Sequence, residues 1–161
     1  QYPTKKFILA NMIVTMGGRA AEILLYNCLT NKDNNEKYTD DKIFTNIKNL
    51  DITSGASQDL KQLDNLARRY IELFGYNSDS FYSDINSSGI IQVPTNPYVS
   101  LSDKTIEKID ENVVKLNKWA IINALKILKH NKDIMINLAN ELITNREVSK
   151  LYLDKYNITY Y

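Results

Sequence analysis

Apolar side chains recur every three or four residues through two long stretches of this sequence, and this spacing is what most constrains the fold. Residues three and four positions apart share one face of an α-helix, whereas a half-buried strand requires alternation. In the stretch that ends at Gly75, the recurring positions are Leu60, Leu63, Ala67, Tyr70, Ile71 and Phe74. In the stretch after Ser102, they are Ile106, Ile109, Val113, Leu116, Ala120, Ala124 and Ile127. We therefore predict an all-α fold.

The ends of these two helices carry recognisable signals. Ser57 is a favourable N-cap for the first helix and Gly75 is a suitable C-terminal stop, so an element is predicted over residues 54–75. Ser102 can cap the second helix, which is expected to run to the polar turn at residues 130–132. Both helices thus have a start and a stop that local chemistry explains.

A helical hairpin is predicted at the C-terminal end of the chain. The turn at 130–132 is short, so the helix that begins at Asp133 is expected to be the antiparallel neighbour of the preceding one. The residues at 144–147, Thr-Asn-Arg-Glu, match a capping box and predict the start of a last short helix. Residues 102–161 are thus read as a hairpin and a final short helix within a single domain, 1–161.

The N-terminal segment is strongly apolar and has a glycine pair in its middle. Helical spacing starts at Thr4 and resumes after Gly17-Gly18, which predicts a kinked helix over residues 1–26. A glycine inside a helix costs about 1 kcal/mol relative to Ala, so we expect another backbone to approach closely there. Arg19 and Glu22 can face each other across one turn, and a buried ion pair that locks the kinked helix is predicted.

Two segments lack a regular apolar pattern. Residues 27–50 are polar and rich in Asn, and are predicted to be a surface loop with a short helical piece near residues 43–47. Residues 76–101 contain scattered Ser, Asn, Gly and Pro, and are predicted to be an irregular linker with one strand-like run at residues 90–93.

Composition excludes several classes of function. The 161 residues include 20 basic and 19 acidic ones, a net charge of +1, so the chain lacks the basic field that nucleic acids require. No run reaches the roughly 18 to 20 apolar residues of a membrane span. Cys28 is the single cysteine, which excludes an internal disulfide, and we assign it a packing role only.

Few residues could carry chemistry. Asp59 lies in the first turn of its predicted helix, after a tight turn at Gly55, where the helix dipole stabilises any carboxylate by roughly 0.3–1 kcal/mol. One His and one Cys cannot complete the three or four ligands that zinc usually takes. Asp59 is therefore either an ordinary helix-start acid or a metal ligand whose partners lie outside the chain. His130 is expected to be a solvated cap and Trp119 a core residue.

Three segments match a known family in content and in order. They are Met16-Gly17-Gly18-Arg19-Ala20-Ala21-Glu22, then Ile52-Thr53-Ser54-Gly55-Ala56-Ser57-Gln58-Asp59-Leu60, then Ala67-Arg68 running to Phe74-Gly75. Together they resemble the peptidase domain of the FtsH-type AAA proteases, which are membrane-anchored, ATP-dependent zinc metalloproteases. The C-terminal helices look like the closing helices of the same domain, so the resemblance covers nearly the whole chain. It implies that the chain is the C-terminal part of an FtsH-like peptidase domain.

The resemblance implies a zinc site in the complete domain. In the family, an H-E-x-x-H helix supplies two His ligands and a general-base Glu, and an Asp at the position of Asp59 supplies the third ligand. Glu22 matches a family acid near that site and is implied only as a group that orients a ligand. The sequence has no H-E-x-x-H, so this chain alone is expected to be inactive, with the motif upstream of Gln1. The stretch from Glu22 to Asp59 is longer than usual for the family, as a surface-loop insertion would make it.

The resemblance also implies partners and a location. The parent would be an ATP-dependent zinc metalloendopeptidase that degrades unfolded or membrane proteins as a homo- or hetero-hexamer. A separate ATPase domain would bind ATP, because this chain has no phosphate-cradling glycine loop. The parent would reach the membrane through an N-terminal segment outside this chain, with the mitochondrion or another organelle expected in a eukaryote. Two alternatives stay open: an inactive homologue that serves as a ring scaffold or substrate-docking module, and a helical interaction domain unrelated to proteolysis.

Overall fold

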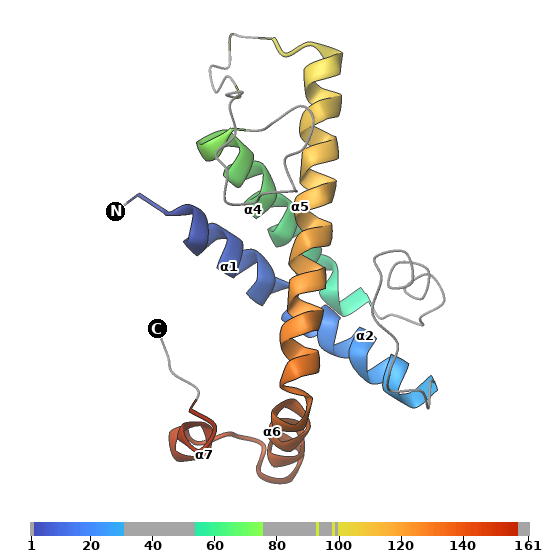
Figure 1. Cartoon of the computed structure of the whole chain (residues 1–161), viewed down its shortest axis with the longest axis vertical. Coiled ribbons are helices and arrows are strands. Elements are labelled where there is room, and N and C mark those ends of the chain that lie inside the picture. The colour runs from blue at the N-terminus through green and yellow to red at the C-terminus, as the bar shows by residue number, and fades with distance from the viewer. Residues whose placement is uncertain (1, 31–53, 76–92, 94–97, 99, 158–161) are drawn as a thin grey trace. The chain divides into compact units, whose positions relative to one another are not determined.

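The computed structural model describes residues 2–30, 54–75, 93, 98 and 100–157 (Figure 1). All regular structure within these residues is helical, which confirms the predicted all-α fold class. The predicted loop from residue 31 onward, its helical piece at 43–47 and most of the linker at 76–101 lie outside the described residues. The side chain of Cys28 does so too.

Helices α1 (Lys5–Thr15) and α2 (Gly17–Thr30) form the predicted kinked helix. Thr4 caps α1, because its hydroxyl oxygen accepts a 3.2 Å hydrogen bond from the backbone nitrogen of Phe7. The two helices are bent by 41° at the break between them. Helix α2 continues to Thr30, four residues past the predicted end of the kinked helix.

The glycine pair at the break does not contact another backbone in the described part of the chain. A Cβ atom added at Gly17 or Gly18 would meet nothing within 4 Å there. The close approach that we expected at these positions is therefore not found within that part. The glycines instead coincide with the change in helix direction, a common cause of sharp kinks.

No single described helix is long and apolar enough to cross a membrane. Helix α1 and the first part of α2 satisfy such a criterion only as a pair bent by 41°. The inward side of this pair belongs to the protein core, where the buried residues are Ile8, Met12, Met16, Ala20, Ile23 and Leu24. Burial in the core therefore accounts for the apolar character of one side of the pair.

Helix α4 (Ser57–Phe74) follows the short 3-10 turn η1 (Ser54–Ala56). The predicted Ser57 cap is wrong: Ala56 occupies the N-cap position without a side-chain hydrogen bond, because η1 continues directly into the helix. Gly75 ends α4 as predicted, with a φ of 75° and a 2.8 Å hydrogen bond from its nitrogen to the carbonyl of Ile71. The buried residues of α4 are Leu63, Ala67, Tyr70 and Ile71. Leu60, which we expected on the same face, is 48% exposed.

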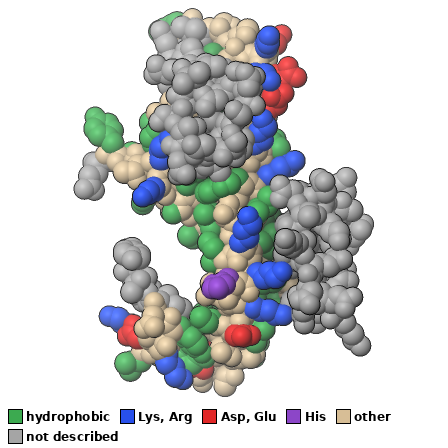
Figure 2. Space-filling view, in the orientation of Figure 1, with side chains coloured by type: hydrophobic (Ala, Val, Ile, Leu, Met, Phe, Trp, Pro, Cys, Tyr) green, Lys and Arg blue, Asp and Glu red, His purple; other side chains and the backbone are tan. Residues whose placement is uncertain are grey.

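Helix α5 (Asp103–His130) is the longest element and ends at the predicted turn. The Ser102 hydroxyl accepts a 3.2 Å hydrogen bond from the nitrogen of Thr105, which confirms the predicted cap. The buried residues of α5 are Asn112, Val113, Leu116, Ala120, Ile121, Ala124 and Leu125. The outermost apolar positions, Ile106 and Ile127, are 45% and 50% exposed, and Trp119 is half-buried rather than part of the core. Basic side chains are spread along α5 and do not form one patch in the face shown in Figure 2.

The chain divides into two compact units, Gln1–Leu125 and Lys126–Tyr161, and each is described by itself. In the first unit, α1 packs along α4. Helices α4 and α5 run antiparallel, because Arg68 bonds to Asp110 whereas Leu60, earlier on α4, shares a groove with Asn117, later on α5. The single-domain assignment stays a prediction.

The second unit contains α6 (Lys132–Asn145) and α7 (Lys150–Asp154). Helix α6 begins at the predicted turn, and its antiparallel pairing with α5 stays a prediction. None of the residues of α6 or α7 is fully buried.

The predicted capping box at residues 144–147 is wrong. Thr144 lies inside α6, where its hydroxyl donates a 2.9 Å hydrogen bond to the carbonyl of Asn140. The helix ends at Arg146, which adopts a left-handed conformation with a φ of 59°. Ser149 is the true cap of α7, because its hydroxyl oxygen accepts a hydrogen bond from the nitrogen of Tyr152.

Candidate functional site

Asp59 lies in the first turn of α4, as predicted. The residue is partly exposed, and its carboxylate forms no hydrogen bond or ion pair with another residue that the structure describes. The unpaired backbone N–H groups at a helix start favour a negative charge at this position. Among the described residues, nothing thus competes with a cation or water for this carboxylate.

The backbone that carries Asp59 is anchored on both sides. Ala56, three residues before it, is 6% exposed, and Leu63, four residues after it, is 2% exposed. Buried residues in a close-packed interior leave their backbone little room to move. Asp59 therefore extends a short side chain from a fixed point, which is the arrangement a metal ligand requires.

The described residues do not form a complete metal site. No three His, Cys, Asp or Glu residues are grouped so that they could hold an ion within the part of the chain that the structure describes. His130 is exposed in the last turn of α5, and its role as a cap stays a prediction. Zinc takes three or four nitrogen, sulfur or oxygen ligands. Asp59 fits the role of one such ligand, and the others would have to come from outside the described residues.

Arg19 and Glu22 form the predicted ion pair, with Arg19 Nη1 3.2 Å from Glu22 Oε2. The side chain of Arg19 is 10% exposed and that of Glu22 is 49% exposed, so only the arginine half of the pair is buried. No hydrogen bond or ion pair between Glu22 and Asp59 is present in the structure as described. Among the described residues, Glu22 contacts Arg19 and neutralises its charge.

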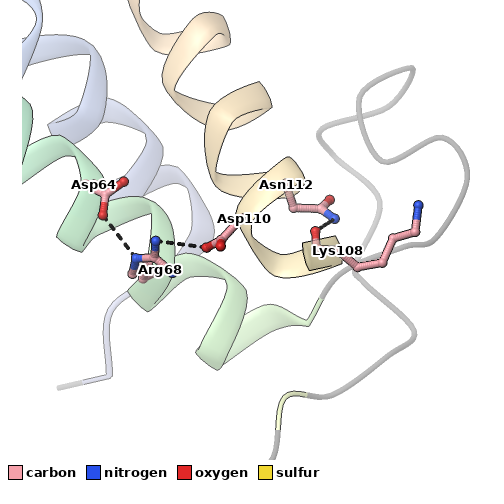
Figure 3. A network of polar contacts seen from close by, with 5 residues as sticks. All are labelled: Asp64, Arg68, Lys108, Asp110 and Asn112. Atoms are coloured by element: carbon pink, nitrogen blue, oxygen red, sulfur yellow. Dashed lines mark hydrogen bonds and ion pairs between the residues drawn. The ribbon is translucent and has the colours of Figure 1, made fainter. Parts of the chain in front are cut away.

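A second polar cluster joins α4 to α5 (Figure 3). Arg68 Nε donates to Asp64 Oδ2 and Arg68 Nη2 donates to Asp110 Oδ1, each at 3.0 Å. The hydrogen bond that Arg68 donates to Asp64 raises the pKa of Arg68 most; burial opposes this, and the bond donated to Asp110 raises the pKa further. This cluster was not predicted from the sequence, because Asp110 lies 42 residues from Arg68. The spacing of four residues from Asp64 to Arg68 was the available signal.

A groove of about 540 Å³ lies between α4 and α5, lined by Leu60, Lys61, Asp64, Asn65 and Asn117. At 100° per residue, the four α4 residues of this lining lie on the opposite side of the helix from Asp59. The groove and Asp59 therefore do not combine into one site.

Comparison with known proteins identifies the class to which this helical domain belongs. The sequence profile of the family described as Peptidase family M41 matches residues 1–155. The chain therefore belongs to peptidase family M41, which confirms the resemblance to FtsH-type peptidase domains.

Curated relatives carry the name of ATP-dependent zinc metalloprotease. FTSH 2, chloroplastic, from Arabidopsis thaliana is 27% identical over 147 residues, which cover 90% of this chain and 18% of that protein. FtsH from Karelsulcia muelleri (strain DMIN) is 29% identical over 150 residues, or 93% of this chain and 20% of that protein. FtsH from Neorickettsia risticii (strain Illinois) is 30% identical over 156 residues, which cover 92% of this chain and 20% of that protein. The chain spans about a fifth of the length of these relatives. No solved structure matches it.

Proposed function

We propose that this chain is part of the peptidase domain of an ATP-dependent zinc metalloendopeptidase and that Asp59 is one ligand of its zinc ion. Family membership over residues 1–155 supports the first statement. The observation that carries the second is the environment of Asp59, a partly exposed carboxylate on an anchored helix start, without a partner in the described part of the chain. The relatives' names attach zinc and ATP dependence to those proteins.

The remaining ligands would come from residues outside this sequence, which contains one His and one Cys. When bound by three protein ligands, zinc supplies a water of lowered pKa and polarises a carbonyl. Asp59 contributes one negative charge and a fixed oxygen to that set. Glu22 is proposed to orient a neighbouring ligand, since its half-exposed carboxylate pairs with Arg19 through one oxygen, Oε2.

The same proposal includes the partners of the complete protein. We propose that it cleaves unfolded or membrane polypeptides, that a separate domain binds ATP, and that it assembles as a homo- or hetero-hexamer. A segment outside this sequence would attach it to a membrane, in an organelle if the source is a eukaryote. Support comes from the family and from relatives such as the chloroplastic protein of Arabidopsis thaliana.

Zinc content of the complete protein tests the role of Asp59. Elemental analysis of the purified protein should give one zinc per chain, and a fluorescently labelled unfolded protein should be cleaved when ATP is present. Asp59→Asn should lose most of the zinc and the cleavage while keeping the helical circular dichroism. Asp103→Asn makes the same change in the first turn of α5 and should keep both. A wild-type protein without zinc, or full zinc in the Asp59 variant, contradicts the proposal.

A further inference from the structure

We draw no further inference here: the strongest candidate, the groove between α4 and α5 that Lys61 and Asn117 help to line, carries nothing, because Asn117 Oδ1, a buried oxygen without a hydrogen-bond partner among the described residues, is closed off from any ligand that enters from solvent, and nothing in the structure shows what occupies the groove.

Discussion

Because Arg19 is buried and Glu22 is half-exposed, we expect substitutions of these two residues to change the free energy of unfolding by different amounts. Removing one partner of a fully buried ion pair costs about 3–5 kcal/mol, because the other charge is left buried and unpaired. Glu22 is 49% exposed, so water screens the 3.2 Å contact and weakens it. We therefore expect Glu22→Gln to lower the free energy of unfolding by about 1–2 kcal/mol. Arg19→Met removes the buried charge and keeps the side-chain length, so it should change that free energy by less than about 1 kcal/mol.

Urea denaturation of the 161-residue chain, followed by circular dichroism at 222 nm, measures both effects. A loss of about 1–2 kcal/mol corresponds to a fall in Tm of roughly 2–8 °C for a chain of this length. Glu72→Gln is the matched control, because Glu72 is exposed on α4 and has no ion pair with any described residue. It should leave the urea midpoint within error of the wild type.

Two results would refute this reasoning. If Glu22→Gln is as stable as the control, the carboxylate does not neutralise the buried guanidinium. If Arg19→Met costs more than Glu22→Gln, the guanidinium itself stabilises the kinked helix through contacts that the ion pair does not represent. Measuring the double variant closes the cycle and gives the coupling between the two side chains.

Three further predictions concern stability and titration. Asp110→Asn breaks one of the two half-exposed bonds of Arg68 and should cost about 0.5 kcal/mol in urea denaturation, with the loss shrinking at high salt. Gly75→Ala places a side chain at a φ of 75° and should lower the free energy of unfolding by about 1–2 kcal/mol, measured in the same way. The hydrogen bond with Tyr156 raises the pKa of Tyr152 to about 12. A raised tyrosine pKa favours the neutral form, so this contribution to stability is present below pH 10 or so and is lost as pH rises toward about 12. Tyr156→Phe should bring the Tyr152 ionisation back toward pH 10 or so in a 295 nm absorbance titration, with Tyr152→Phe as the reference.

The sequence predicted the helices well where periodicity and end signals agreed. Ser102 and Gly75 mark real ends, because the cap hydrogen bond and the left-handed φ are local properties of the chain. Thr144 has the residue type of a cap but lies inside a helix, because a threonine hydroxyl can donate to the carbonyl four residues back. Helical periodicity does not report how far along a helix its neighbours extend. The exposure of Ile106 and Ile127 near the two ends of α5 therefore could not be predicted from it.

The candidate site was predictable only in part. The position of Asp59 at a helix start followed from local sequence, and its role as a ligand followed from the family resemblance and remains a prediction. The cluster of Arg68 with Asp110 depends on how two helices pack, which no local pattern reports. Asn112 was missed for the same reason. Its residue is 2% exposed, and its amide nitrogen lies 2.7 Å from the carbonyl oxygen of Lys108.

The lack of full burial throughout α6 and α7 has a consequence for the order in which the chain opens. None of the described residues from Lys126 onward is fully buried, so these residues have little apolar contact to resist transient unravelling. Its amide protons should exchange with solvent well before those of α4, whose inward side is closed off from water. A protease added in trace amounts should likewise cut within α6 and α7 before it cuts within α4.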